Sequence, residues 1–423
     1  MMKSSEKLTR ALEHEDGPVP IDFGSTAVTG IHVSIVGKLR DYYGLEKRPV
    51  KVNEPYQMLG EVEPDLREAM SIDVVGAYGL NTIFGFPLGN WKEWRAPWGQ
   101  ELLVPGNFNV SARGKDVVIY PEGDTTVPAS GRMPEGGFFF DTIIRQEPID
   151  EEKLDPKDNL EEFGPASDEE LQHMARESEK AAKTGCGVIA NFGNTGFGDI
   201  ALVPGPFLKK PKGIRDVAEW YMSTAGRKDY VRAVFDKQLE YALQNLPKFK
   251  EAAGDRIHVL FICGTDFGTQ ESQFCSPAAF EELWLPCYKS MNDWIHENTS
   301  WKTFKHSCGA VEPLMELFIK AGFDVINPVQ CSAAGMDPGL LKSRYGDRLV
   351  FWGGGVDTQS TLPFGTPEQV RQQVLKRCEV FSGNGGFVFN TIHNVQAKSP
   401  VENVAAMIEA VKEFNGRENI SGD

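Results

Sequence analysis

The chain has 423 residues, of which 41% are hydrophobic and 25% are charged, so it can bury one large domain core or two smaller ones. Its 44 lysines and arginines are outnumbered by 60 aspartates and glutamates, and the net charge of −16 is spread along the chain without a basic block. Such a charge repels nucleic acid and anionic membrane surfaces, so we expect neither as a partner.

The N-terminal stretch MMKSSEKLTRALEHEDG predicts an amphipathic helix without the apolar core of a secretory signal. No run of about 18 apolar residues, the length that a membrane-spanning helix needs, occurs along the chain. The seven cysteines are scattered and odd in number, unlike the cysteines of a small disulfide framework. We therefore expect a cytoplasmic protein with reduced thiols.

Eight short apolar segments, each bounded by glycine or polar residues, are expected to form β-strands. In chain order they are residues 19–24, 72–79, 187–193, 257–264, 301–307, 323–329, 349–355 and 387–393. From the third onward they alternate with helical patterns at 216–249, 276–298, 310–322, 337–346 and 366–383. Apolar strands separated by helices are typical of a parallel sheet covered by helices. Eight such units predict an α/β fold, a (β/α)8 TIM barrel, and an open doubly wound sheet fits the same pattern as the alternative.

Residues 81–182, between the second and third predicted strands, differ in character from the rest of the chain. They contain Trp91, Trp94 and Trp98, the turn sequences PEGD and PASG, and an alternating run, VVIYPEGDTTVPAS, that predicts a hairpin. We expect this segment to be a β-rich cap over one mouth of the barrel, inserted into a single domain of residues 1–423.

The stretch KHSCGAVEPL, residues 305–314, places His306 and Cys308 two positions apart at the end of the fifth predicted strand. Residues two apart on a strand point to the same side, and barrels place their chemistry at the carboxyl ends of strands. Zinc accepts histidine nitrogen and cysteine sulfur, and a catalytic zinc needs about three protein ligands. The third ligand has two candidates, His393 after the eighth predicted strand and Cys331 after the sixth. On spacing alone, a pair of this kind is more often incidental than metal-binding.

Further polar side chains follow the predicted strands and are expected to converge on the same mouth. They are Asp266 and Gln270 in GTDFGTQ, Asn327 and Gln330 in INPVQ, Asp357 and Gln359 in GGGVDTQ, and Asn390, Asn394 and Gln396 in FNTIHNVQ. Taken singly, helix caps and Asx turns explain such residues, and for Asp357 and Asn394 this is the better single explanation. Their repeated position after strands is what indicates a site.

Four segments, KHSCG, INPVQ, FWGGGVDTQ and GGFVFNTIHNVQAKSPVENVAAM, together resemble the uroporphyrinogen decarboxylase superfamily, most firmly over residues 257–412. The resemblance implies a (β/α)8 barrel with one of two activities. One is the metal-free decarboxylation of a porphyrinogen. The other is methyl transfer by zinc enzymes that exchange methyl groups with a corrinoid protein, such as methylcobamide:coenzyme M methyltransferases and their relatives in O-demethylase systems.

The second activity agrees better with the residues. Where the decarboxylases carry an arginine-rich RQAGR element and an FSDIL aspartate, this chain reads FGSTAVTGIH and LNTIFGF. The methyltransferases bind zinc through His-x-Cys and a later cysteine, and the resemblance therefore implies His306 and Cys308 as ligands. At the last position this chain has His393, which departs from the family's cysteine and leaves Cys331 as the alternative.

We therefore expect a zinc-dependent methyltransferase that moves a methyl group between a small substrate and cobalamin. The chain has no DxHxxG-type corrinoid anchor, so the cobalamin is expected on a separate carrier protein. A second neutral histidine in place of a thiolate makes the metal more electron-poor, which favours O-demethylation of a methoxylated aromatic. The aromatic residues of the cap, Phe138, Phe139, Phe140, Trp91 and Trp94, suit a flat apolar substrate. Whether the chain forms a homodimer is left open.

The remaining roles and alternatives are as follows. Asp266, Gln330 and Asp357 are expected at the reacting centre, and Asn327, Gln270, Asn390 and Trp91 at the substrate. One alternative is a methylcobamide:thiol methyltransferase. Another is a metal-free decarboxylase in which Arg132, Arg215 and Arg344 hold a carboxylated substrate. A third is a barrel that binds a ligand or partner without catalysis.

Overall fold

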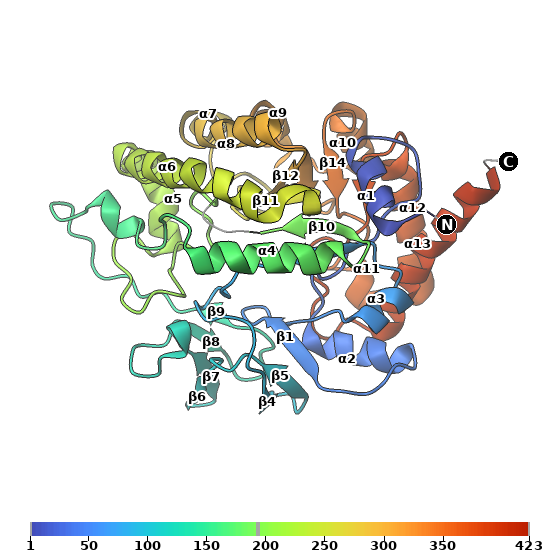
Figure 1. Ribbon diagram of the computed structural model, residues 1–423, viewed down its shortest axis with the longest axis horizontal. Helices are drawn as coiled ribbons and strands as arrows, with labels where there is room; N and C mark the ends of the chain where they lie inside the picture. The colour runs from blue at the N-terminus through green and yellow to red at the C-terminus, as the bar shows by residue number, and fades with distance from the viewer. Residues whose placement is uncertain (1, 192–194, 422–423) are drawn as a thin grey trace.

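In the computed structural model, which describes residues 2–191 and 195–421, a seven-stranded parallel sheet curls around the centre of the molecule (Figure 1). The order of the strands is β15-β14-β13-β12-β11-β10-β3. Their bounds are β3 (Val74–Ala77), β10 (Gly187–Ala190), β11 (Val259–Cys263), β12 (Lys302–His306), β13 (Val325–Asn327), β14 (Val350–Trp352) and β15 (Phe387–Val388). All seven lie within predicted strands; the end of the predicted strand 187–193, from residue 192, lies outside the described residues.

The first predicted strand joins the two edges of this sheet. Ile21 forms a parallel bridge with Phe389, the Asp22 N–H donates to Phe389 O (3.0 Å), and the Phe389 N–H donates to Pro20 O (2.8 Å). On the other side, the Asp73 N–H donates to Ile21 O (2.8 Å). Residues 20–22 therefore lie hydrogen-bonded between β15 and the start of β3. The predicted barrel is confirmed, and the open sheet is not formed.

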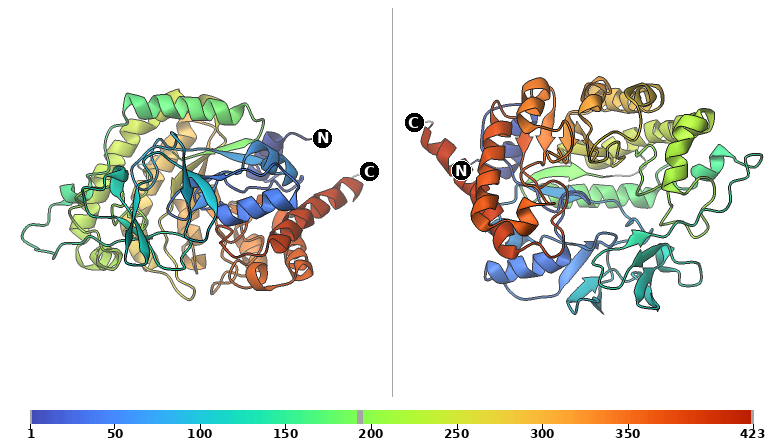
Figure 2. Two further views of the ribbon diagram at one scale, coloured as in Figure 1. Left: turned by 90° about the horizontal axis from the view of Figure 1, so that it is seen from below. Right: turned by 180° about the vertical axis from the view of Figure 1, so that it is seen from behind.

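Helices surround the ring of strands (Figures 1 and 2). They are α1 (Ser4–Leu12), α2 (Val33–Tyr42), α3 (Pro64–Ala69), α4 (Asp168–Ala182), α5 (Val217–Gly226), α6 (Lys228–Ala253), α7 (Pro277–Leu283), α8 (Leu285–Asn298), α9 (Met315–Lys320), α10 (Pro338–Tyr345), α11 (Thr361–Phe364), α12 (Pro367–Ser382) and α13 (Val401–Ser421). Short 3-10 turns are η1 (Pro121–Gly123), η2 (Pro156–Asn159), η3 (Gly254–Arg256) and η4 (Glu312–Leu314). No helix within the described residues is long and apolar enough to cross a membrane.

Two predicted helices are each divided in the structure. The pattern at 216–249 becomes α5 and α6, which meet at Arg227 with φ −129°, and the pattern at 276–298 becomes α7 and α8. Pro286 lies at the second residue of α8, where its missing N–H and fixed φ are tolerated at a helix start but not in a helix interior. The apolar periodicity continues through both breaks, which is why the sequence pattern does not reveal them.

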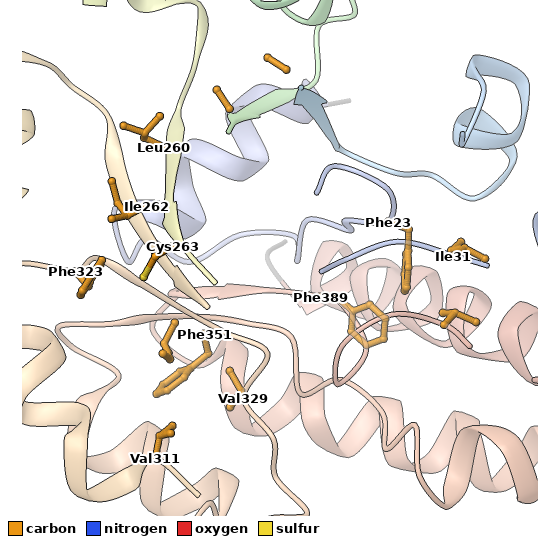
Figure 3. Close-up of a cluster of buried hydrophobic side chains, with 14 of the residues drawn as sticks. Phe23, Ile31, Leu260, Ile262, Cys263, Val311, Phe323, Val329, Phe351 and Phe389 are labelled. Carbon is orange, nitrogen blue, oxygen red and sulfur yellow. The ribbon is translucent and has the colours of Figure 1, made fainter. Parts of the chain in front are cut away.

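The hydrophobic core has an inner and an outer part, because successive strand residues point to opposite faces of the sheet. The inner part fills the barrel with Phe261, Phe304, Trp352 and their neighbours, and Leu8 of α1 packs against it. The outer part lies between strands and helices, where Leu260 and Ile262 of β11 and Phe351 of β14 contact it (Figure 3). Since Phe304 points inward, the alternation turns His306 inward and Lys305 outward.

The β-rich region forms two four-stranded sheets, β2-β1-β5-β4 and β6-β7-β8-β9. Their strands are β1 (Val50–Glu54), β2 (Leu59–Gly60), β4 (Lys92–Arg95), β5 (Glu101–Val104), β6 (Val110–Arg113), β7 (Asp116–Ile119), β8 (Gly131–Met133) and β9 (Asp141–Thr142). They lie together on one side of the barrel (Figures 1 and 2). The sequence analysis missed β1 and β2, which precede residue 81 and join the first sheet through parallel pairing of Val50 with Leu102.

Candidate metal centre

Three predicted ligands come together at the carboxyl ends of the strands. His306 ends β12, Cys308 follows it by two residues, and His393 lies five residues beyond β15. One ligand atom from each lies within 4.8 Å of the others, and Cys308 Sγ is 3.5 Å from His306 Nε2. In a tetrahedral zinc site with Zn–N about 2.05 Å and Zn–S about 2.3 Å, a nitrogen and a sulfur ligand lie about 3.6 Å apart. The observed spacing of these two atoms therefore fits zinc.

The turn after Cys308 is held by side chains from the neighbouring strand ends. Asp266, after β11, accepts from the Cys308 N–H at 2.6 Å through Oδ1, and Gln330, after β13, accepts from the Gly309 N–H at 2.8 Å through Oε1. Gly309 has φ +88°, and a Cβ there would lie 2.5 Å from Gly268 O. Only glycine can adopt this conformation so close to Gly268. The glycine after Cys308 therefore lets the chain turn immediately after the thiol.

His306 is oriented by an asparagine on the next strand. Its Nδ1–H donates to Asn327 Oδ1 at 2.6 Å, and Asn327 Nδ2 donates to Trp352 O at 2.7 Å, which fixes the direction of the amide. With the proton on Nδ1, His306 Nε2 presents its lone pair to the Cys308 thiol, 3.5 Å away. Metal-binding histidines commonly carry such a partner on the other nitrogen. Both ends of the fully buried Asn327 amide are thus engaged, with Trp352 O and with the His306 ring. A contact of Asn327 with substrate remains a prediction.

His393 differs from His306 in two respects. Its Nδ1 accepts from the Asn394 N–H at 2.8 Å, so a neutral ring carries its proton on Nε2 and must turn or shift that proton before it binds an ion. Its backbone has φ +67°, a left-handed conformation that costs a bulky residue about 1–3 kcal/mol and that clusters at functional sites. The fold thus holds this ring in place at a cost in backbone strain.

Both histidine rings and the cysteine thiol of this group are uncharged at pH 7. Burial lowers the pKa of His306 to about 4 and that of His393 to about 4, so both rings are neutral at pH 7. Burial, followed by the nearby Asp266 carboxylate, raises the pKa of the Cys308 thiol well above its usual range. Two neutral imidazoles and a thiol whose proton is displaced on binding form a nitrogen and sulfur ligand set that suits zinc.

Cys331, the alternative third ligand, makes a different contact. Its thiol donates to Val329 O at 3.3 Å, and burial raises its pKa to about 11. Among the residues that the structure describes, the group of three with the spacing of a metal site contains His393 and not Cys331. The geometry therefore favours His393 as the third ligand, and its binding of a metal remains a prediction.

The other predicted site residues are distributed unevenly. Asp357 accepts from the N–H groups of Gln359 and Ser360 through Oδ1 (2.7 and 3.1 Å), which is the Asx turn that was its simpler explanation. Gln270 is exposed on a loop, and Trp91 lies 5.8 Å beneath the Lys51 ammonium in the β-rich region. These contacts lie outside the group formed by His306, Cys308 and His393.

Asn390 and Asn394, in the last predicted strand and after it, have structural contacts that the sequence analysis did not assign. The Asn390 amide N–H donates to Asp22 O at 2.6 Å, and its Oδ1 is buried without a protein partner. Asn394 accepts from the Gly30 N–H (2.5 Å) and donates to Ala27 O (2.9 Å). Asn394 therefore fixes the loop after the first strand beside His393, rather than acting only as a turn residue.

Two charged residues with apolar surroundings were missed. Asp22 is fully buried inside the barrel, where its Oδ2 accepts from Trp352 Nε1 at 2.9 Å, and Lys305 is fully buried behind β12. The signal that could have found them is a charged residue within an otherwise apolar strand, in VPIDFG and WKTFKHS, because such residues are almost never buried without a specific partner.

Aromatic residues of the β-rich region reach the segment that follows His393. The ring of His32 shares a hydrogen bond with Phe138 O (2.9 Å), while the His32 N–H donates to Val395 O (2.9 Å). The Lys398 ammonium lies 4.9 Å from the Phe138 ring, which stacks on Trp98 at 5.3 Å. Of the aromatic residues expected in the cap, Phe138 is thus beside the site, and the function of the region as a cap remains a prediction.

Comparison with known proteins identifies the relatives of this barrel. Residues 210–414 match the family uroporphyrinogen decarboxylase (URO-D). The second half of the chain is thus similar to the uroporphyrinogen decarboxylase family. The resemblance that the strand-end motifs predicted is thereby confirmed.

Two curated members of the uroporphyrinogen decarboxylase superfamily illustrate how far the similarity extends. The uroporphyrinogen decarboxylase of Psychromonas ingrahamii is 32% identical over 106 residues, which is 23% of this chain and 29% of that protein. That of Pseudoalteromonas translucida is 32% identical over 108 residues, 24% of this chain and 30% of the relative. The chain thus spans less than a third of the length of these relatives.

A solved structure agrees over the whole chain. A methyltransferase from Methanosarcina mazei aligns with a TM-score of 0.54 at 15% identity, and the alignment covers 98% of this chain and 99% of that one. At this identity the likeness shows that the two chains share a fold, and nothing about the reaction.

Proposed function

We propose that this chain is a zinc-dependent methyltransferase that moves a methyl group between a small methylated substrate and the cobalamin of a separate corrinoid protein. The favoured reaction is O-demethylation of a methoxylated aromatic. The observation that carries the proposal is the convergence of His306, Cys308 and His393, two nitrogens and one sulfur, at the carboxyl ends of β12 and β15. The metal-free decarboxylases that the sequence resembles work without a metal, so a group of metal ligands is not expected in them.

A zinc ion in this site would supply Lewis acidity, which stabilises the phenolate or alkoxide that departs when its methyl carbon is attacked. Residues around the site orient two of the predicted ligands. Asn327 directs the lone pair of His306 Nε2 toward the group, while Asp266 and Gln330 hold the Cys308–Gly309 turn. Two neutral rings and one thiolate would leave a divalent ion with a net charge of about +1, which attracts an anionic oxygen.

The contacts of the three candidate arginines speak against a decarboxylase that grips a substrate with several carboxylates. Arg215 is buried and pairs with Glu162 at 3.0 Å, and Arg344 pairs with Glu312 at 2.8 Å. Arg132 is exposed on β8 and lies 3.5 Å from Asp116. Each of these cations is already opposed by a carboxylate of the chain itself.

Methyl transfer to a reduced corrinoid protein tests the proposal. Purified protein is incubated with reduced corrinoid carriers and, separately, with methoxyarenes, methylamines and methylated thiols, and methylcobalamin formation is followed by absorbance. We expect methylation from a methoxyarene, and loss of at least a hundredfold in rate for His306→Ala. Release of carbon dioxide from a tetrapyrrole acid by chelator-treated protein would refute the proposal, as would the absence of transfer with every donor and acceptor. Transfer to a thiol alone would support the methylcobamide:thiol alternative.

A further inference from the structure

Lys305 lies directly before His306 and is fully buried on the opposite face of β12. A lysine ammonium is expensive to bury unless its three N–H groups find acceptors. Lys305 Nζ donates to Thr265 O at 2.6 Å and to His306 O. It also lies 4.9 Å from the centre of the Phe267 ring and 5.9 Å from that of Phe318, distances at which a cation is attracted to an aromatic face.

The two carbonyl acceptors belong to the metal centre's own segments. Thr265 immediately precedes Asp266, the residue that accepts from the Cys308 N–H, and the other carbonyl is that of His306 itself. One ammonium therefore bonds the segment after β11 to the end of β12. It adds to the two other hydrogen bonds between these segments, from the Cys308 N–H to Asp266 Oδ1 (2.6 Å) and from the Phe267 N–H to Ser307 Oγ (2.9 Å).

Two acidic side chains interact with the charge of Lys305. Asp266 and Asp199 are both partly buried, and Asp199 accepts from the Gly264 N–H at 3.1 Å, close to the same strand end. Burial raises the pKa of both carboxyl groups, and the positive charge of Lys305 opposes that effect on each. Lys305 therefore acts electrostatically on two nearby acidic side chains, and it bonds the carbonyl of a predicted metal ligand.

We propose that Lys305 is a positioning residue of the metal centre, whose buried ammonium sets the relative placement of His306, Cys308 and Asp266. The inference rests on the proposed function, because it concerns the same site, and it adds a residue that touches none of the ligand atoms. A lysine that merely fills space between β12 and the aromatic residues of α8 and α9 would be replaceable by methionine without effect on the metal.

The test compares Lys305→Met with Tyr288→Phe. Methionine keeps the length of the side chain and removes its charge and N–H groups. The Tyr288 ring lies 5.9 Å from Lys305 Nζ, and its hydroxyl accepts from Cys263 Sγ (3.2 Å) and donates to Thr265 Oγ1 (3.4 Å). Phenylalanine removes these two hydroxyl contacts but neither hydrogen bond of the Lys305 ammonium. Zinc affinity is measured by competition with a chromophoric chelator, and the Co(II)-substituted forms are compared by absorption.

We expect Lys305→Met to bind zinc about 10–100-fold more weakly and to change the d–d bands of the Co(II) form, as substitution of residues behind metal ligands does. Tyr288→Phe should stay within about twofold of the wild type in affinity, since its change does not reach the ligands. Wild-type affinity and spectrum in folded Lys305→Met would overturn the inference while leaving zinc binding intact. Absence of zinc from the wild type would instead overturn the proposed function. If Lys305→Met does not fold, Lys305→Gln, which keeps an N–H donor without the charge, replaces it under the same criteria.

Discussion

Asn327 offers a quantitative test of how the metal centre is built, because a matched asparagine lies elsewhere in the barrel. Asn327 and Asn390 are both fully buried at strand ends, and each donates from Nδ2 to a backbone carbonyl, at 2.7 Å to Trp352 O and at 2.6 Å to Asp22 O. Only Asn327 has a partner on Oδ1, the His306 ring at 2.6 Å. Leucine at either position removes a hydrogen bond to a backbone carbonyl. Only Asn327→Leu also removes the hydrogen bond to His306.

The structure sets the size of the expected effects. A buried group left without its hydrogen bond costs about 1–3 kcal/mol, so both leucine variants should be destabilised by at least that amount. Loss of a partner behind a metal ligand typically weakens metal binding 10–100-fold, or about 1.4–2.7 kcal/mol. Asn327→Leu should therefore bind zinc at least about tenfold more weakly than Asn390→Leu, and it should also lose more stability, because it leaves two buried groups unpaired where Asn390→Leu leaves one.

Both quantities can be measured on the same preparations. Zinc affinity is obtained by chelator competition, and stability of the metal-free proteins by denaturant unfolding. Equal zinc affinities for the two variants, both shown to be folded, would refute the idea that Asn327 orients His306 for a metal.

Three further predictions concern the ligands and a buried carboxyl group. Cys308→Ala should abolish stoichiometric zinc, while Cys331→Ala should retain it, as metal analysis of both variants would reveal; the reverse pattern would reject Cys308 as the sulfur ligand. His306→Ala should weaken zinc binding more than His393→Ala, because the His306 ring already has its proton on the nitrogen that faces away from the group, whereas the His393 ring must first turn or shift its proton; equal losses in a chelator titration would contradict this. Burial raises the pKa of Asp22 from 3.8 to about 6, so the folded chain holds a proton that the unfolded chain releases between these values. Its contribution to stability is full below about pH 4 and falls by about 3 kcal/mol as the pH rises through 6, and Asp22→Asn should remove that part of the slope in denaturant unfolding at pH 4 to 7.

The barrel was predictable from the sequence because its strands are continuous apolar segments separated by amphipathic helices. All eight segments take part in the ring. Residues 19–24 do so through the bridge between Ile21 and Phe389 and not as a full strand. The strand pair β1 and β2 was not found, since VKVNEPYQMLG is short and mixed in polarity and gains its strand conformation by pairing with β5, about fifty residues away. Tertiary pairing of this kind overrides local propensity.

The candidate ligands were predictable for a different reason. His306 and Cys308 share a strand end, and the barrel topology brings every strand end to one mouth, so a short motif and a strand count were enough to place them together. The roles of Asn327 and Lys305 depend on which face of a strand each occupies and on the orientation of one amide. The one-dimensional pattern contains neither, so it could not predict the contact of Asn327 with His306 or the hydrogen bonds of the buried Lys305 ammonium.

The central claim is that His306, Cys308 and His393 hold one zinc ion at the mouth of the barrel. Anomalous diffraction at the zinc absorption edge, on crystals of protein purified without chelator, tests it most directly. The account predicts a single strong peak bonded to His306 Nε2, Cys308 Sγ and a ring nitrogen of His393, with a fourth position left for substrate. A zinc-free site, or a peak bonded to Cys331 with His393 turned away, would contradict it.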